Sequence, residues 1–242
     1  FVFAVTPFNF TAIGGNLSMA PALTGNTVLW KPSSTAVYSN WMVMQAFMEA
    51  GLPPGVINFI PGDSSAIGKL VLSDPALAGV HFTGSTAAFN SMWQVIGGDI
   101  GRYRTYPRIV GETGGKDFLV AHASAEPQGL ATCLVRGAFE YQGQKCSATS
   151  RAYIPSSIWP DVRDRMLGML SQIKVGPVED FSNFMGAVID KASFDNISSY
   201  LDYARNSADC SIIHGGTCDD SSGYFVQPTV VETKNPHDKM ME

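Results

Sequence analysis

The stretch GVHFTGSTAAFNSMWQVI, residues 79–96, predicts a buried β-strand that passes directly into an α-helix. Residues 79–82 form the strand, a Thr-Gly-Ser turn follows, and residues 86–96 have helical spacing. The first turn of a helix has free backbone N–H groups that attract phosphate, and a glycine lets a ligand approach the backbone. A plain helix N-cap has the same sequence pattern, and no GxGxxG sequence occurs. The turn alone therefore leaves both explanations open.

The same alternation of apolar runs and helical patterns extends over the first half of the chain. We predict strands at residues 1–5, 27–30 and 56–60 and helices at 14–23, 35–50 and 64–72, with Ser33 or Ser34 as the N-cap of the second helix. Regular alternation of this kind is typical of βαβ units that build a parallel sheet. The sequence therefore predicts an α/β fold that begins with a Rossmann-like domain.

A second α/β series follows. We predict strands at residues 118–121, 151–154, 210–213 and 225–232 and helices at 127–141, 158–173 and 192–206. The glycine turn at residues 111–115 is the expected junction, which gives domains 1–114 and 115–242. A junction there puts Glu112 and Cys146 on two sides of a cleft, where small-molecule sites are common.

Composition excludes several classes of protein. A hydrophobic share of 45% and a charged share of 15% fit an ordinary globular chain. The net charge of −5 argues against a nucleic-acid surface, and no apolar run is long enough to span a membrane. No signal peptide is recognisable at the start. Both ends interrupt a structural pattern, so we expect an internal fragment of a longer protein.

The cysteines are not equivalent. Cys146 lies in EYQGQKCSA, residues 140–148, on a polar, glycine-containing turn expected to display a reactive thiol. Cys133 falls in an apolar helical run and is expected to be a small buried hydrophobe. Cys210 and Cys218 flank a glycine turn without a CxxC spacing, which disfavours a disulfide, and the four histidines lack metal-ligand spacing. Glu112, on a glycine-rich turn, could supply the base that a thiol ester needs for hydrolysis.

Two longer strings carry a family resemblance: YPRIVGETGGKDF, residues 106–118, and GAFEYQGQKCSA, residues 137–148. They resemble the glutamate and cysteine motifs of the aldehyde dehydrogenase superfamily, and within it the branch that oxidises L-glutamate γ-semialdehyde. The resemblance covers essentially the whole chain, with four motifs in the family's order. It implies a parallel-sheet NAD(P)-binding domain followed by part of an α/β catalytic domain.

The resemblance also implies how the cofactor binds. Lys31 matches the lysine on the adenosine ribose, and Ser85 matches the serine on the pyrophosphate, with Ser33, Thr83 and Gly84 beside them. The expected cofactor is NAD, with NADP as the alternative. Many members have an acidic residue where this chain has a serine at position 34. An acidic side chain would repel a 2′-phosphate and serine would not, so the choice stays open.

Catalytic roles follow in the same way. The resemblance implies Cys146 as the nucleophile, Asn9 as an oxyanion donor and Glu112 as the base that activates water. Ser147 would hold the substrate carboxylate, and Phe10 would line its aliphatic part. The implied reaction converts L-glutamate γ-semialdehyde, the open form of Δ1-pyrroline-5-carboxylate, to L-glutamate in proline catabolism through a thiohemiacetal and a thioester.

Other functions remain open at this point. One is an aldehyde dehydrogenase with a different substrate, and another is a non-catalytic binding or structural protein of the same fold. Retention of a cysteine, a glutamate and an asparagine in matching motifs favours an enzyme. The expected partner is a small aldehyde, without nucleic acid or membrane, in a homo-oligomer when the protein is full length. The expected location is the cytoplasm of a bacterium or the mitochondrial matrix of a eukaryote.

Overall fold

The computed structural model describes all 242 residues, and they form two compact units, Phe1–Gly114 and Gly115–Glu242. Each unit has its own sheet structure and its own core. None of the helices combines the length and the apolar character needed to cross a membrane.

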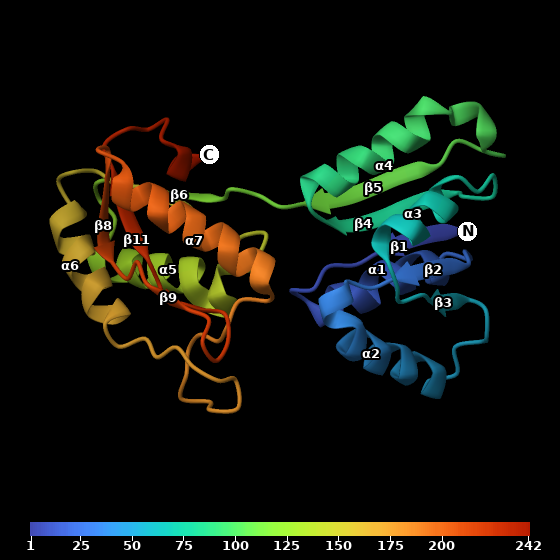
Figure 1. Cartoon of the computed structure of the whole chain (residues 1–242), viewed down its shortest axis with the longest axis horizontal. Helices are drawn as coiled ribbons and strands as arrows, with labels where there is room; N and C mark the ends of the chain where they lie inside the picture. Colours follow the sequence, from blue (N-terminus) through green and yellow to red (C-terminus); the bar gives the residue numbers. More distant parts are fainter. The chain divides into compact units, whose positions relative to one another are not determined.

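The first unit is built on a five-stranded parallel sheet (Figure 1). The strands are β1 (Val2–Val5), β2 (Val28–Lys31), β3 (Ile57–Phe59), β4 (Gly79–Gly84) and β5 (Arg108–Thr113), in the spatial order β3-β2-β1-β4-β5. The connecting helices are α1 (Thr11–Leu23), α2 (Val37–Glu49), α3 (Ser64–Leu72) and α4 (Thr86–Gly98). The predicted parallel α/β sheet is therefore confirmed.

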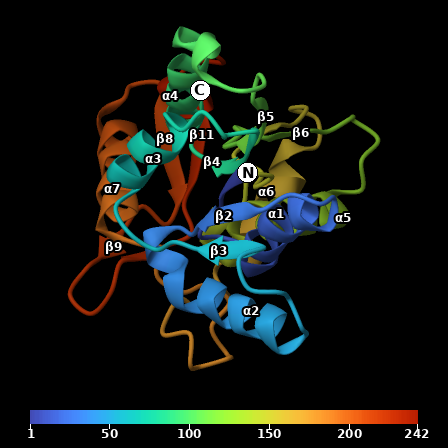
Figure 2. The ribbon, with the colours of Figure 1, turned by 90° about the vertical axis from the view of Figure 1, so that its right-hand side faces the viewer.

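Alternate residues of the strands face two separate cores. Phe3, Val80 and Phe82 pack with residues of α3 and α4 on one face. Ala4 and Trp30 pack on the other face with residues of α1 and α2. Figure 2 shows α2 and α4 on opposite sides of the strands. Because both faces of the sheet are covered, the central strand β1 is entirely apolar, as buried parallel strands usually are, whereas the edge strand β5 is more polar and largely exposed.

The strand order reverses at β1, since β2 and β3 lie on one side of it and β4 and β5 on the other. In open α/β sheets, ligands bind beyond the carboxyl ends of the strands at such a reversal. Thr6 follows β1 there, is buried, and accepts a 2.9 Å hydrogen bond from the Trp30 indole nitrogen. This bond fixes the start of the segment that leads to Asn9.

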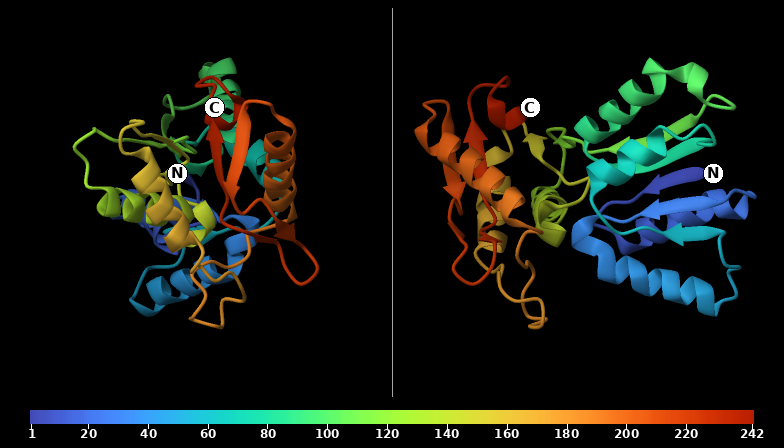
Figure 3. Two further views of the ribbon diagram at one scale, coloured as in Figure 1. Left: turned by 90° about the vertical axis from the view of Figure 1, so that its left-hand side faces the viewer. Right: turned by 45° about the vertical axis from the view of Figure 1, so that its right-hand side comes forward.

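The second unit contains three pairs of strands and three helices. β6 (Phe118–Val120) and β7 (Arg151–Tyr153) are parallel, whereas β8 (Cys210–His214) with β11 (Val230–Thr233), and β9 (Cys218–Asp219) with β10 (Phe225–Val226), are antiparallel. The helices are α5 (Pro127–Phe139), α6 (Trp159–Leu170) and α7 (Lys191–Asn206). Figure 3 shows α7, in orange, beside the red β8–β11 pair.

The core of the second unit lies mainly between α5 and α6. Its buried members are Leu130, Ala131, Leu134, Val135, Val162, Met166 and Leu170. Ile213 of β8 and Val230 of β11 pack against the same cluster. Glu126 caps α5 by accepting hydrogen bonds from the backbone N–H groups of Gln128 and Gly129, and Pro127 opens the helix, where its missing N–H costs nothing.

Several predicted elements were wrong in detail, and the edge strand β5 was not predicted. The helix expected at residues 158–173 covers Trp159–Leu170. The helix expected at residues 127–141 ends at Phe139, because Tyr141 and Gln142 adopt left-handed backbone angles. The single strand expected at 225–232 is split into β10 and β11, and Pro228, which cannot donate to a ladder, lies between them. The helix expected at 14–23 begins three residues earlier, at Thr11.

Candidate functional site

Cys146 lies on a tight turn in the second unit. Ala148 N donates to Lys145 O at 3.1 Å and closes the turn, with Cys146 and Ser147 at its two central positions. The Cys146 side chain is half-buried, Ser147 is exposed and Ala148 is buried. The small side chain at position 148 allows the turn to pack against the rest of the unit.

The loop that precedes this turn has an unusual backbone. The 3-10 segment η3 (Glu140–Gly143) contains Tyr141 at φ 56° and Gln142 at φ 57°, followed by Gly143 at φ 67°. Left-handed angles cost a residue with a side chain about 1–2 kcal/mol each. Glycine is needed at 143 for a second reason, because a Cβ there would lie 2.8 Å from Ala138 O.

An ion-pair network holds the loop to the end of α5. Glu140 accepts hydrogen bonds from Lys145 Nζ at 2.5 Å and from Arg136 Nη2 at 2.7 Å. The hydrogen bonds from Lys145 and then Arg136 lower the pKa of the Glu140 carboxyl below its usual range. The ammonium group of Lys145, the residue before Cys146, is therefore in an ion pair with Glu140.

Glu112 does not lie on a turn, as the sequence suggested, but in the edge strand β5, where it is exposed. The following glycines, Gly114 and Gly115, form the break. Pairing with β4 carries the strand through Gly111 to Thr113. A ring from α4 occupies the space above Gly111, because a Cβ there would lie 2.3 Å from Phe89 Cε2. Glycine at this position thus reflects packing.

Asn9 and Phe10 follow β1 at the reversal of strand order. Phe10 has an extended backbone and is the N-cap residue of α1. Both side chains are half-buried.

Lys31 is the last residue of β2 and is buried, with 5% of its surface exposed. Burial lowers the pKa of its ammonium group, and the negative charge of Asp63 opposes this shift. Ser33 shares a 3.1 Å hydrogen bond with Thr35 and precedes the 3-10 turn η1 (Ser34–Ala36). Neither serine gives the predicted capping bond: Ser33 caps η1 without a side-chain hydrogen bond, and the N-cap of α2 is Ala36.

Thr83 and Gly84 close β4, and Ser85 is the N-cap of α4. The Ser85 hydroxyl accepts a 3.3 Å hydrogen bond from Ala88 N. A Cβ on Gly84 would lie 2.7 Å from Phe82 Cζ, so glycine is required here by the chain's own packing. Ser85 can cap α4 and the same turn can still bind a phosphate, because the other N–H groups in the first turn of α4 have no partner within the helix.

The other cysteines lie elsewhere, and one prediction was wrong. Cys133 is exposed on the outer face of α5. Its neighbours Leu130, Ala131, Leu134 and Val135 fill the inner face, so helical spacing turns position 133 outward. Cys210 and Cys218 are free thiols, and the Cys218 sulfur shares a hydrogen bond with the Ser198 hydroxyl. No cluster of three His, Cys, Asp or Glu residues could hold a metal ion.

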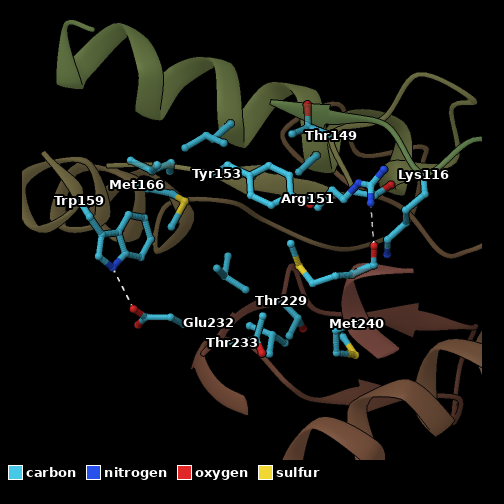
Figure 4. A pocket seen from close by; sticks show the side chains of 18 of the residues that line it. Lys116, Thr149, Arg151, Tyr153, Trp159, Met166, Thr229, Glu232, Thr233 and Met240 are labelled. Carbon is cyan, nitrogen blue, oxygen red and sulfur yellow. Dashed lines mark hydrogen bonds between the residues drawn. The ribbon is translucent and has the colours of Figure 1, made fainter. Parts of the chain in front are cut away.

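A groove of about 530 Å³ in the second unit escaped the sequence reasoning (Figure 4). It lies between β7 and β11 and is lined mostly by apolar side chains. Thr149, three residues after Cys146, is one of its lining residues. Three cationic side chains line it: Lys116, Arg151 and Lys234. Burial and then the charge of Arg151 lower the pKa of Lys116. Arg151 donates to Met241 O at 2.9 Å. Neither Cys146 nor Ser147 lines this groove, so it is distinct from the predicted reactive turn.

The predicted residues therefore form two groups. Asn9, Lys31, Thr83, Gly84, Ser85 and Glu112 all lie at the carboxyl edge of the first unit's sheet or directly after it. Cys146 and Ser147 lie on the turn of the second unit. Sequence reasoning missed the supports of this turn, Gln142 and Gln144, whose contacts depend on residues about 45 positions away.

Comparison with known proteins gives consistent matches. The family model described as "Aldehyde dehydrogenase family" matches residues 1–242. The mitochondrial Delta-1-pyrroline-5-carboxylate dehydrogenase of Dictyostelium discoideum is 54% identical over 244 residues, which cover 100% of this chain and 44% of that protein. The human protein of the same name is 50% identical over 243 residues, covering 100% of this chain and 43% of its own length.

Solved structures agree with the sequence relatives. The Delta-pyrroline-5-carboxylate dehydrogenase from Mycobacterium tuberculosis bound with NAD superposes with a TM-score of 0.95 at 54% identity, over 98% of this chain and 44% of that one. The 1-pyrroline-5-carboxylate dehydrogenase from Thermus with bound NAD gives 0.91 at 30% identity, over 99% and 46%. The chain thus spans less than half the length of these relatives.

Proposed function

Because the chain belongs to the aldehyde dehydrogenase family, we propose that the full-length protein oxidises L-glutamate γ-semialdehyde to L-glutamate with NAD. The observation that carries this proposal is the 50–54% identity, over the entire chain, to proteins named Delta-1-pyrroline-5-carboxylate dehydrogenase. Residues 1–114 would form the cofactor-binding domain, and residues 115–242 would supply part of the catalytic domain.

The residues at the carboxyl edge of the first sheet fit a dinucleotide. Lys31 is a buried cation whose pKa is lowered by burial, so an anionic or hydroxyl-rich ligand would offset its desolvation. Ser85 and the start of α4 offer N–H groups for the pyrophosphate, with Thr83 and Gly84 before them and Ser33 beside Lys31. When bound, NAD accepts the two electrons and the hydrogen that leave the aldehyde carbon. The M. tuberculosis and Thermus structures have NAD bound, which supports NAD over NADP.

Cys146 is the proposed nucleophile. Its thiolate adds to the aldehyde carbon and forms a C–S bond, while the carbonyl oxygen gains negative charge. The Asn9 amide and the Cys146 backbone N–H would donate to this oxygen. Loss of the aldehyde hydrogen with its electron pair re-forms the C=O bond and leaves a thioester on Cys146.

Glu112 is the proposed base for the second half of the reaction. Its carboxylate takes a proton from water as the water oxygen attacks the thioester carbon. The C–S bond breaks, the thiolate returns to Cys146, and the carboxylic acid leaves. A carboxylate exposed at the end of an edge strand can reach a water, which this step requires.

Ser147 and Phe10 are the proposed substrate contacts. The exposed Ser147 hydroxyl would donate to the substrate carboxylate, and the Phe10 ring would pack against the aliphatic chain. One neutral hydroxyl does not offset the desolvation of a carboxylate, so further donors are needed from other parts of the full-length protein.

The test is an aldehyde panel on the full-length protein with NAD and with NADP. We expect glutamate semialdehyde to exceed a simple aliphatic aldehyde of similar length by at least ~10-fold in kcat/KM, about 1.4 kcal/mol in transition-state binding. Ser147→Ala should reduce this preference and leave the simple aldehyde almost unaffected. A better rate with hexanal would remove the semialdehyde assignment while leaving aldehyde oxidation in place.

Location and assembly are part of the same proposal. The Dictyostelium and human relatives are named mitochondrial, which supports the mitochondrial matrix if this protein is eukaryotic; in a bacterium we propose the cytoplasm. Phe118 and Val120 on β6 are 61% and 65% exposed, and exposed apolar side chains of this kind favour a contact surface, so we propose a homo-oligomer of the full-length protein. Light scattering of the full-length protein tests the assembly.

A further inference from the structure

The loop before Cys146 has a conformation that its own residues disfavour. Tyr141 and Gln142 are consecutive left-handed residues with side chains, and Gly143 extends the left-handed run. Such a run persists only when surrounding contacts hold it. Relaxation of these residues would displace the turn at Cys146, which begins two residues after Gly143.

Two glutamine side chains in this loop bond to one backbone segment. Gln142 Nε2 donates to Ala187 O at 3.1 Å, and Gln144 Oε1 accepts from Ile189 N at 2.9 Å. The two bonds have opposite polarity: the Gln142 side chain donates to a backbone carbonyl, and the Gln144 side chain accepts from a backbone N–H. Residues 187–189 lie about 45 positions away in sequence, so the loop is tied to a distant element of the same unit.

The segment at 187–189 is itself fixed. Val188 is 5% exposed, and its N–H donates to Tyr224 O at 2.9 Å. Asp190 follows immediately and caps α7 by accepting a 2.8 Å hydrogen bond from Ser193 N. Gly186 leaves room for the amide, because a Cβ there would lie 3.0 Å from both Gln142 Nε2 and Val178 Cγ1. The glutamines therefore bond to a rigid support.

The opposite side of the cysteine turn is also held. Lys145 pairs with Glu140, and Thr149 N donates to Gly137 O at 2.9 Å. The backbone of Gly115 approaches closely, so that a Cβ on it would lie 3.2 Å from Cys146 O. With these contacts on one side, the two glutamines complete the restraint of the turn from the other.

We propose that Gln142 and Gln144 are positioning residues that clamp the left-handed loop to residues 187–189 and thereby set the place of the Cys146 thiol and backbone N–H. This inference rests on the proposed role of Cys146 as the nucleophile. A displacement of about 1 Å in a reacting group can reduce a rate by up to about 100-fold. Loss of either amide bond should therefore slow the chemistry at Cys146 while leaving the cofactor residues of the first unit untouched.

The first experiment replaces each amide by a side chain of similar length without hydrogen bonds. Gln142→Met and Gln144→Met are made in the full-length protein, and the rate of iodoacetamide modification at Cys146 is followed by peptide mapping. We expect both variants to show an altered modification rate and a fall in kcat of about ten-fold or more, with the KM for NAD unchanged. The matched control is Gln172→Met, an exposed glutamine, which should retain wild-type rates.

The second experiment uses the opposite polarity of the two bonds. Gln144→Glu keeps an acceptor for Ile189 N, whereas Gln142→Glu removes the donor and sets a carboxylate against Ala187 O. Both add the same charge within four residues of Cys146, so their difference reports the hydrogen bonds. We expect Gln144→Glu to keep a kcat about ten-fold or more above that of Gln142→Glu. Equal kcat values in the two variants would overturn the proposal.

A milder variant covers the case in which the methionine variants do not fold. Gly186→Ala forces the Gln142 amide to shift by a few tenths of an ångström and should lower kcat less than Gln142→Met. Wild-type kcat and modification rate in Gly186→Ala and in every folded methionine variant would overturn the clamp. Modification of Cys146 needs neither aldehyde nor NAD. A wild-type protein without dehydrogenase activity would therefore refute the proposed function. The rates of Cys146 modification in the variants would still test whether Gln142 and Gln144 position the thiol.

Discussion

Thr83 of β4 and Glu112 of β5 are direct register partners in the parallel sheet. The proposed cofactor turn and the proposed base therefore occupy neighbouring strands at the same carboxyl edge, although 29 positions separate them. Parallel pairing causes this relationship, because it aligns the ends of strands that are far apart along the chain. Sheet register thus sets the position of the proposed base, Glu112, which is exposed.

Replacement of Cys146 by alanine should abolish aldehyde oxidation and leave NAD binding nearly intact. In the proposed mechanism the thiol forms the bond to the substrate, whereas the proposed cofactor residues belong to the first unit. The measurement is steady-state NADH formation together with NAD titration by calorimetry. Because Cys133 is exposed, thiol mapping should be done in a Cys133→Ser background. Faster alkylation of Cys210 or Cys218 than of Cys146 would count heavily against this nucleophile.

Replacement of Glu112 by glutamine should permit one burst of NADH and then stop turnover. In the proposed mechanism the first half of the reaction does not use Glu112, whereas hydrolysis of the thioester needs it as the base. Stopped-flow absorbance gives the burst, and intact mass spectrometry should find the acyl group on Cys146. Equal loss of the burst and of the steady state would mean that Glu112 acts before the thioester forms.

Replacement of Lys31 by methionine should weaken NAD binding and at the same time stabilise the folded protein at pH 7. Burial lowers the pKa of Lys31 below 10.5, so the folded state disfavours its protonated form. Between the lowered pKa and 10.5 the unfolded state binds more protons, and the stability of the wild type rises with pH in that window. The advantage of Lys31→Met in urea unfolding should therefore shrink as pH rises toward 10.5. An advantage that is constant with pH would contradict this account.

Replacement of Gly111 by alanine should reduce stability by about 1–3 kcal/mol, because the new methyl group meets the Phe89 ring. The matched control is Gly97→Ala in α4, where a Cβ meets nothing within 4 Å. That change should stabilise the protein by about 0.5–1 kcal/mol through the lower entropy of the unfolded chain. Chemical denaturation measures both, and equal effects would show that Phe89 moves aside without cost.

Local sequence predicted four of the five strands and all four α-helices of the first unit, but not the edge strand β5. Apolar runs separated by helical patterns are set by side-chain spacing, and the parallel sheet follows from their alternation. The turn at Ser85 was also visible, since capping chemistry is local. The motifs around Glu112 and Cys146 pointed to the family, which the match over residues 1–242 bears out.

Tertiary structure decided what local patterns do not encode. Glu112 was expected on a turn and lies in β5, because pairing with β4 extends the strand through Gly111 and up to Thr113. Cys133 was expected inside and is outside, because the packing of α5 on α6 selects which apolar stripe is buried. The helix stops at Phe139, and the left-handed loop beyond it bonds to residues 187–189. Sequence alone fixes the residue types near Cys146, whereas the position of its thiol depends on bonds between residues about 45 positions apart, which only the folded chain brings together.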